Sequence, residues 1–410
     1  MISLKKVIVI GGGAAGLMAA GTAGECGNDV TIIETNSRPA RKVMITGKGR
    51  CNVTNNTDID GLVKSAGKNG RFLYSAFCEF SAQDTMKFFE SMGVPLKTER
   101  GNRVFPVSDK SVDIVDALTA YARKYAKIIT DRAVAVSVGD GSVNGVVLQS
   151  GRTVACDAVI LATGGLSYPL TGSTGDGYAM AKQIGHSVTP LRSSLVGLEC
   201  AEGFCARMQG LALRNVAVKL YKNGAKKPVF SDFGELLFTH YGISGPTVLS
   251  ASRLIGDTAA ADYVLSVDLK PALDEAALDA RILRDFSHSS NRDFSNSLDG
   301  LLPKSLIPTV ISLSKIPKEN KVNQITKQQR AALVALLKNF TVHITALRPI
   351  EEAVITAGGI SLREVDPATM RSKLIKGLSF AGEILDVDAC TGGFNLQIAF
   401  STGVKAGKNI

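Results

Sequence analysis

Near the amino terminus, the apolar residues fall into short unbroken runs rather than into a helical or an alternating pattern. Val7–Ile10 is one such run, and Asn28–Glu34 is a second one that ends in an acid. β-Branched runs of this kind are typical of parallel strands that are buried on both faces. Between the two runs, small apolar residues from Ala14 to about Cys26 predict a helix. The pattern therefore predicts a strand–turn–helix–strand unit.

The turn of this unit carries the spacing G-x-G-x-x-G, formed by Gly11, Gly13 and Gly16. In dinucleotide-binding folds the first glycine permits the tight turn, and the second lets the backbone approach a pyrophosphate. The third lets the helix pack closely on the strand. The helix begins at Ala14 and Ala15, where free N–H groups can point at phosphate. We therefore predict that these five residues bind a dinucleotide.

Glu34 completes the motif, because it lies 18 residues after Gly16 at the end of the second run. A carboxylate at about this spacing binds the ribose hydroxyls of a dinucleotide. Because it also repels a 2′-phosphate, the site suits FAD or NAD and not NADP. A secretion signal or membrane anchor over Lys5–Gly24 is disfavoured, because three glycines interrupt its apolar core after four residues.

The composition is that of an ordinary soluble globular protein, with 45% hydrophobic and 20% charged residues among 410. This length predicts two or three domains. Seven scattered cysteines favour a reducing cytoplasm over a secreted disulfide scaffold, and four isolated histidines predict no metal site.

The net charge is +10, but the basic residues are scattered. We therefore expect a solvated basic surface, a small-molecule substrate rather than nucleic acid, and no membrane contact. The oligomeric state is not indicated.

A second fragment points to the kind of dinucleotide. DAVILATGG, residues 157–165, is another buried strand that enters a glycine turn. It resembles the A-T-G turn of flavoproteins that have two dinucleotide-binding folds. The resemblance implies that FAD is the cofactor and that Ala162, Thr163 and Gly164 lie close to it.

A third fragment, LSFAGEILDV at residues 378–387, resembles the late motif of the same superfamily, in which an apolar strand leads to Gly-Asp. The resemblance implies that the acid after Gly382 accepts hydrogen bonds from the ribityl chain. Here that acid is Glu383 instead of aspartate, so Asp386 could share or take over the role. Either acid could also be an ordinary turn residue or helix cap. Because the three fragments span the chain, we expect both of its ends to build one FAD domain.

Six longer stretches narrow the resemblance to one family of bacterial flavoproteins. It includes the bile-acid Δ4,6-reductase and many proteins described as NAD(P)/FAD-dependent oxidoreductases or as aminoacetone-oxidase-like. The stretches are Ile45–Asn55, Gly70–Phe77, Gly101–Ser108, Leu166–His186, Gly234–Pro246 and Gly382–Gly403. The family implies an α/β fold: a three-layer, Rossmann-like FAD-binding domain around a parallel sheet, with an inserted β-barrel-like domain and a helical cap. We place the FAD domain at 1–187 and 350–410, the β-rich domain at 188–274 and 340–349, and the cap at 275–339.

A cationic loop with two glycines follows Glu34, and we predict that it contacts the cofactor. Forked arginine donors suit phosphate, whereas glycines permit backbone approach to the flat flavin ring. The residues concerned are Arg41, Lys42, Gly47, Lys48, Gly49, Arg50, Cys51 and Asn52. The alternative is a solvated basic loop. Disulfide reductases of the superfamily carry a cysteine pair at about this point, and Cys51 stands alone, so no dithiol chemistry is expected there.

Two further contacts are expected at the two ends of FAD, the adenine and the flavin. The superfamily implies that the backbone near Val134 holds the adenine, although Val134 also suits a strand core. The last helix is expected to start near Phe394, with the N–H groups of Gly393, Phe394 and Asn395 at the flavin pyrimidine edge. A helix amino end there stabilises the negative charge that appears when flavin is reduced.

The sequence predicts a cytoplasmic FAD-dependent oxidoreductase. Hydride would pass between NAD(P)H or an organic donor and a small organic substrate through bound flavin. Only one G-x-G-x-x-G occurs, so we expect NAD(P)H to bind transiently, and the choice between a reductase and an amine-type oxidase stays open. His240 is the best side-chain candidate to face the substrate, followed by Tyr241, although a lone histidine is more often structural. The alternative function is a flavin-bearing redox-sensing or binding protein with nucleic acid as its partner.

Overall fold

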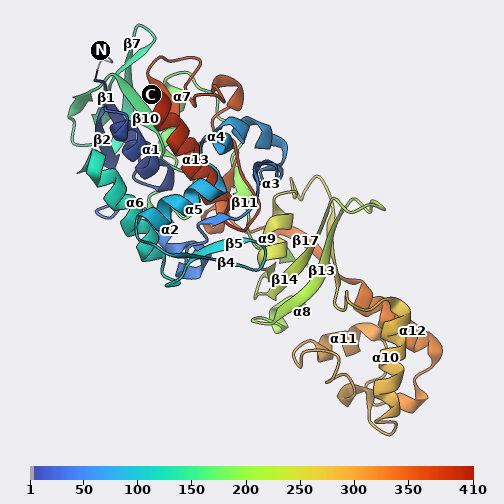
Figure 1. The fold of residues 1–410 in the computed structure, drawn as a ribbon. Helices are drawn as coiled ribbons and strands as arrows, with labels where there is room; N and C mark the ends of the chain where they lie inside the picture. Colours follow the sequence, from blue (N-terminus) through green and yellow to red (C-terminus); the bar gives the residue numbers. More distant parts are fainter. Residues whose placement is uncertain (1–3) are drawn as a thin grey trace. The chain divides into compact units, whose positions relative to one another are not determined.

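The computed structural model describes residues 4–410, and the chain folds into two compact units (Figure 1). The first unit combines Met1–Ser194 with Ile350–Ile410, and the second is Leu195–Pro349. The helical segment belongs to the second unit, so the separate cap remains a prediction. No helix within residues 4–410 has the length and apolar character that crossing a bilayer requires.

A five-stranded parallel sheet forms the centre of the first unit. Its strand order is β19 (Leu378–Phe380), β10 (Ala158–Leu161), β1 (Lys6–Ile10), β2 (Asp29–Glu34) and β6 (Ala126–Thr130). In the register of the sheet, Ile10 lies opposite both Leu161 and Ile33. The three motif-bearing strands therefore end at one edge, and the predicted parallel sheet is confirmed.

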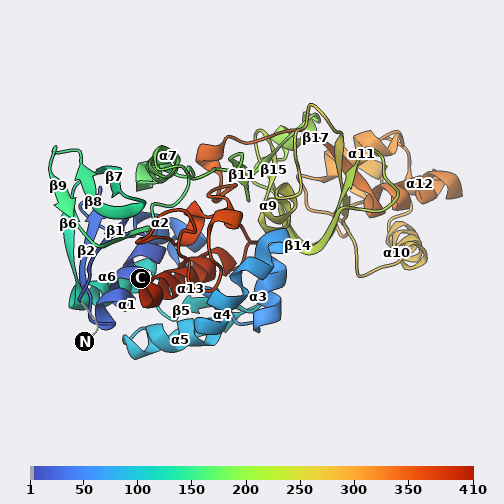
Figure 2. The same cartoon turned by 90° about the horizontal axis from the view of Figure 1, so that it is seen from above.

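Three helices pack on one face of this sheet, and Figure 2 shows them as α6 (Ser111–Tyr125), α1 (Ala14–Glu25) and α13 (Phe394–Asn409). Glycines let α13 come close to α1. A Cβ at Gly403 would lie 2.6 Å from the Ala15 carbonyl oxygen, and one at Gly407 would lie 2.6 Å from that of Ala19. The carboxyl-terminal helix is thus fitted directly onto the helix of the glycine motif.

The opposite face carries a three-stranded antiparallel sheet of β7 (Ala133–Gly139), β8 (Ser142–Leu148) and β9 (Thr153–Ala155), which gives the predicted third layer (Figure 2). Shorter elements complete the unit. They are α2 (Arg41–Ile45), β3 (Thr54–Asn55), α3 (Ile59–Ser65), α4 (Tyr74–Glu79), α5 (Ala82–Ser91), β4 (Leu96–Glu99), β5 (Arg103–Pro106), α7 (Asp176–Gln183), β11 (Arg192–Ser194) and β18 (Ile355–Ala357).

The second unit contains a closed antiparallel barrel, as the family resemblance implied. Its strands run in the order β12 (Leu198–Cys200), β15 (Gly242–Ser244), β14 (Phe230–Phe238), β13 (Ala212–Lys222), β16 (Tyr263–Asp268) and β17 (Phe340–Leu347). Inward-facing Val218, Leu220 and Leu265 are fully buried in it. Its helices are α8 (Phe204–Arg207), α9 (Pro246–Ser252), α10 (Glu275–Ser287), α11 (Ile307–Ser314) and α12 (Lys327–Lys338).

Candidate cofactor site

A cavity opens in the first unit where β1, β2 and β10 end. It encloses about 1310 Å³ that protein atoms do not fill, the solvent at its mouth included. It brings together twelve residues predicted from the sequence: Gly11, Gly13, Ala14, Ala15, Glu34, Arg41, Lys42, Ala162, Thr163, Gly164, Glu383 and Asn395.

The three motif glycines differ in what surrounds them. Gly11 has a φ of +102°, and a Cβ there would lie 2.6 Å from the Ala162 carbonyl oxygen. A Cβ at Gly16 would lie only 1.8 Å from the Gly11 carbonyl oxygen, so Gly16 supports helix packing from behind the cavity wall. Around Gly13, by contrast, no heavy atom of the described chain would lie within 4 Å of a Cβ. Gly13 therefore leaves open space at the amino end of α1.

Glu34 is 8% exposed and is held from two sides. Its Oε2 accepts the Gly12 N–H at 2.7 Å, and its Oε1 accepts the Asn36 backbone and side-chain N–H groups at 2.8 and 2.7 Å. An ionised carboxylate offers about four acceptor positions, so one position on Oε2 is left for a hydroxyl. This geometry suits a ribose.

Glu383 forms a similar arrangement at another part of the wall. Its Oε1 accepts the Ser167 hydroxyl at 3.0 Å and the Thr356 N–H at 2.8 Å. Lys42 donates to its Oε2 at 2.7 Å and to Ser167 Oγ at 2.5 Å. One acceptor position on Oε2 again remains. Three separate chain segments thus converge on the carboxylate that we predicted for the ribityl chain.

The amino end of α13 also reaches the cavity. Gly393 caps the helix with a φ of +96°, and a Cβ there would lie 2.4 Å from the Thr54 carbonyl oxygen. The first N–H groups of a helix have no acceptor within the helix, and these begin at Phe394. Asn395 lines the cavity, and its side chain bonds Ala389 on both sides, accepting at 2.8 Å and donating at 3.0 Å.

The other predicted cofactor residues lie outside the cavity lining. Val134 is 41% exposed on β7, and its neighbour Ala133 lines the cavity instead. Gly382 packs behind the wall, because a Cβ there would lie 2.7 Å from the Ala15 Cβ. Asp386 uses its backbone carbonyl to accept the Asn69 side-chain N–H at 2.6 Å. Also outside the lining are Gly16, Gly47, Lys48, Gly49, Arg50, Cys51, Asn52, Gly393 and Phe394.

Cys51 is an inert thiol in this environment. Its side chain is 0% exposed, and burial raises the pKa of the Cys51 thiol to about 12. Only the thiolate is nucleophilic. Burial therefore disfavours thiolate chemistry at Cys51.

Several lining residues were not predicted as cofactor contacts. Asn36 joins Glu34 to the opposite wall, because its Nδ2 also donates to the Thr171 carbonyl oxygen at 3.2 Å. Its position two residues after the acid is a usable signal. The segment Thr171–Thr174, which lies in the family stretch Leu166–His186, lines the cavity beside Asn36. Thr46, Met180 and Ile355 carry no sequence signal and reach the cavity through the fold alone.

His240 and Tyr241 belong to the second unit. The Tyr241 ring lies edge-on to the His240 ring at 5.0 Å, and the Arg348 guanidinium lies 4.7 Å from the centre of the Tyr241 ring. Arg348 in turn bonds Glu199 at 2.9 Å. The Tyr241 ring is therefore held in place by a charged neighbour.

Three features of the cavity bear on whether FAD fits. They are the open space at Gly13 and the open acceptor positions on Glu34 and Glu383. These features fit a polar dinucleotide. The cavity is therefore that of a dinucleotide-binding Rossmann protein.

Comparison with known proteins specifies the family. Residues 5–409 match the HI0933-like protein Rossmann domain, and the chain belongs to this family of FAD-binding proteins. It is 31% identical to the 3-dehydro-bile acid delta(4,6)-reductase of Clostridium scindens, covering 99% of this chain and 98% of the relative. It is also 31% identical to the ribosomal RNA dihydrouridine synthase of Escherichia coli, covering 96% and 95%.

Solved structures agree on the fold. A flavocytochrome c3 fumarate reductase matches with a TM-score of 0.50 at 18% identity, covering 100% of this chain and 78% of that one. The 3-ketosteroid delta1-dehydrogenase of Sterolibacterium denitrificans matches with a TM-score of 0.52 at 13% identity, covering 98% of each chain. The comparisons support the expectation of an FAD-dependent oxidoreductase, and they do not favour a redox-sensing protein.

Proposed function

We propose that the protein is an FAD-dependent reductase of a carbon–carbon double bond that is conjugated to a carbonyl group. Two relatives, each about as long as this chain, support the proposal through their names. A 3-dehydro bile acid with 4,6 unsaturation carries such a bond, and uridine becomes dihydrouridine by reduction of a ring bond conjugated to a carbonyl. The shared element is the bond type, whereas the molecules that carry it differ completely.

The residues of the cavity would hold the cofactor in parts. Glu34 would accept a hydrogen bond from a ribose hydroxyl, and Glu383 would accept one from a ribityl hydroxyl. Each would use its one remaining acceptor position. Gly13 and the amino end of α1 would receive the pyrophosphate. The amino end of α13 would stabilise negative charge on the pyrimidine edge. When bound, the flavin supplies the hydride, and the protein supplies binding, orientation and this electrostatic environment.

The electron donor is tested first, in anaerobic stopped flow with the purified flavoprotein. NADH, NADPH and aminoacetone are mixed in turn, and bleaching of the flavin absorbance is followed. We expect NADH or NADPH to bleach it. Bleaching by aminoacetone alone would contradict the reductase and favour the amine-type oxidase, and a purified protein that retains no added FAD would end the proposal.

The substrate is tested in the second half-reaction. Pre-reduced enzyme is mixed anaerobically with a 3-oxo-4,6-diene steroid, with the saturated 3-oxo steroid as a matched control. We expect the conjugated compound alone to reoxidise the flavin, with loss of its own ultraviolet absorbance. Equal reoxidation by both compounds would contradict transfer to the double bond.

A uridine of ribosomal RNA is a second candidate substrate. It is supported by the Escherichia coli relative and by one from Haemophilus influenzae, which is 29% identical and covers 98% of this chain and 97% of the relative. Pre-reduced enzyme is mixed with ribosomal RNA that lacks dihydrouridine, and the product is digested and analysed by mass spectrometry. A mass increase of about two hydrogens on one uridine would select RNA over the steroid.

We also propose that His240 and Tyr241 face the substrate. The Tyr241 ring, held by Arg348, carries a hydroxyl that can donate a proton. In Tyr241→Phe we expect flavin reduction by the donor to be unchanged, while reoxidation by the substrate slows by about 10²-fold, as for the loss of a general acid. Equal slowing of both half-reactions would contradict the assignment.

A further inference from the structure

The loop Gly47–Cys51 adopts a backbone conformation that L-residues rarely use. Gly47, Lys48, Gly49 and Cys51 have φ values of +57°, +59°, +82° and +59°. This conformation is unfavourable for a non-glycine residue, and Lys48 and Cys51 both adopt it. Such a conformation persists only where its surroundings enforce it. The loop must therefore be held by contacts outside itself.

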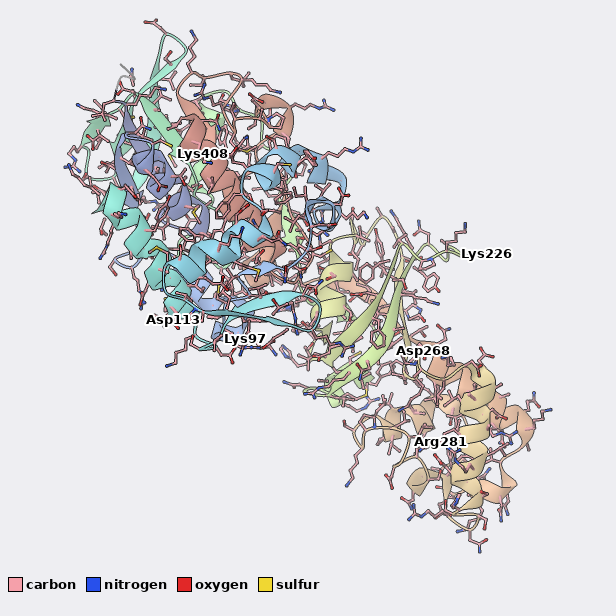
Figure 3. All side chains as sticks on the ribbon, viewed as in Figure 1. Lys97, Asp113, Lys226, Asp268, Arg281 and Lys408 are labelled. Atoms are coloured by element: carbon pink, nitrogen blue, oxygen red, sulfur yellow. The ribbon has the colours of Figure 1, made fainter. Side chains whose placement is uncertain are left out.

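Arg50 supplies those contacts. Its Nε and Nη2 donate to Asp109 Oδ1 at 2.8 and 2.6 Å, and its Nη1 donates to Glu99 Oε2 at 3.3 Å, with a further bond from Nη2 to Glu99. The guanidinium also lies 4.1 Å from the centre of the Phe105 ring. Lys97, which is labelled in Figure 3, reinforces the cluster by bonding Asp109 at 2.8 Å.

The loop joins this cluster to the wall of the cavity. Thr46 lines the cavity, and its carbonyl oxygen accepts the Cys51 N–H at 3.0 Å, which closes the loop. Asn52, the residue after the loop, has its buried Oδ1 without a partner in the described structure. A Cβ at Gly47 would lie 2.9 Å from the Asn52 backbone nitrogen, so Gly47 and Asn52 are in close contact. The positions of Thr46 and Asn52 thus depend on the left-handed turn between them.

We propose that Arg50 is a positioning residue, which clamps the loop Gly47–Cys51 to Glu99, Asp109 and Phe105 so that Thr46 is presented to the flavin half of bound FAD. This inference rests on the proposed function and changes one sequence-based expectation, because Arg50 does not act as a phosphate ligand.

The charges of the cluster explain why phosphate is not the partner of Arg50. Its fork is engaged by two carboxylates, a bidentate geometry that arginine forms especially well. These hydrogen bonds raise the pKa of Arg50, with Glu99 as the largest cause. The Arg50 hydrogen bond also lowers the pKa of Glu99, and the hydrogen bond from Lys97, followed by that from Arg50, lowers the pKa of Asp109. A phosphate at this guanidinium would have to displace partners that are already ionised.

Two ligands distinguish positioning from phosphate binding, because ADP shares the adenosine diphosphate half of FAD and lacks the flavin. The affinities of the apoprotein for both are measured by titration for wild type, Arg50→Lys and Arg50→Met. We expect FAD to bind at least about tenfold more weakly to the variants, which lack the forked donors, and ADP to bind as before. The flavin midpoint potential is expected to shift with the altered ring environment.

Arg103→Lys is the matched control, because Arg103 lies 5.9 Å from the centre of the same Phe105 ring without joining the two carboxylates. It should bind both ligands normally. Equal loss of ADP and FAD affinity in Arg50→Lys would make Arg50 a phosphate ligand and overturn the inference. Unchanged FAD affinity and potential would also overturn it. Failure of the wild type to bind FAD would instead overturn the proposed function.

Discussion

At the residue scale, the G-x-G-x-x-G turn uses glycine for three separate physical reasons. Gly11 needs a positive φ, Gly16 has the Gly11 carbonyl oxygen where a Cβ would lie, and Gly13 borders open space. Only the first two requirements concern the folded protein itself. In the proposed function the third concerns a ligand, so we expect that a substitution can separate structural from binding positions.

Replacing Gly13 and Gly16 by alanine should therefore give opposite results. Gly13 has an ordinary φ of −80°, so Gly13→Ala should melt as the wild-type apoprotein does, while a methyl group in the pyrophosphate space weakens FAD by at least about tenfold. Gly16→Ala would place its methyl 1.8 Å from a carbonyl oxygen and should lower the melting temperature by several degrees. Thermal melts and FAD titrations measure both effects. A Gly13→Ala protein that melts early with normal FAD affinity would contradict the assignment.

At the element scale, α13 connects the carboxyl terminus to several parts of the first unit. Its Gln397 is fully buried, and its Oε1 accepts the hydroxyls of Thr54 at 2.6 Å and Thr85 at 2.8 Å. Its Nε2 donates to the Phe80 carbonyl oxygen at 3.0 Å and to Ser401 Oγ at 2.9 Å. A buried amide with all of these partners fixes one arrangement of the helix and its neighbours.

A second buried network fastens the end of α7. The His186 side chain is 0% exposed, its Nδ1 lies 3.0 Å from Glu364 Oε2, and its Nε2 lies 2.9 Å from Ser372 Oγ. The three residues are spaced like a hydrolytic triad. However, Ser372 Oγ also accepts N–H groups from Leu374 at 3.0 Å and Ile375 at 2.9 Å, which leaves no lone pair for attack. The network is therefore structural.

Stability should fall in mild acid because of this network. Burial lowers the pKa of His186 below its ordinary 6.5. The unfolded chain then binds more protons than the folded one as the pH drops below 6.5, so the free energy of unfolding decreases there. We expect the melting temperature of the flavoprotein to fall from pH 7.5 to 5.5, and less steeply in His186→Gln. His288→Gln, at an exposed histidine, is the control and should follow the wild type. Parallel curves for all three proteins would contradict this explanation.

At the scale of the whole molecule, one cofactor domain is built from both ends of the chain, with a barrel and helices inserted between them. β19 pairs with β10, and the cavity takes residues from each end. Neither terminal segment can complete the site alone. Cofactor binding should therefore be linked to the docking of the carboxyl-terminal segment.

Hydrogen exchange with and without FAD tests this linkage. We expect FAD to increase protection in α1 and in α13 together, because bound ligand suppresses opening of the elements that form its site. Protection in β13 and β16 of the barrel should change less. An increase confined to the amino-terminal segment would contradict a site that both ends complete.

Much of the cofactor site was predictable from the sequence, because its key contacts are local. A strand, a glycine turn and a helix lie within about thirty residues, the usual length of such a unit, so Gly11, Gly13, Ala14, Ala15 and Glu34 could be assigned before folding was considered. The parallel strands followed from the apolar runs and the barrel from resemblance, and both were confirmed. Residue-by-residue roles such as those of Val134 and Asp386 were less certain, because the motif fixes a segment but not which of its residues points inward.

The sequence by itself determined the dinucleotide turn, its acid and the parallel strands around them, since short-range spacing and burial encode these features. Only the tertiary structure decided which distant groups meet. It placed Asn36 against Thr171 and Lys42 against Glu383, and it surrounded Arg50 with Glu99 and Asp109. These partners are separated by up to 341 residues. A charge in a sequence shows that a partner is needed, but only the packed fold determines which partner comes within hydrogen-bond distance.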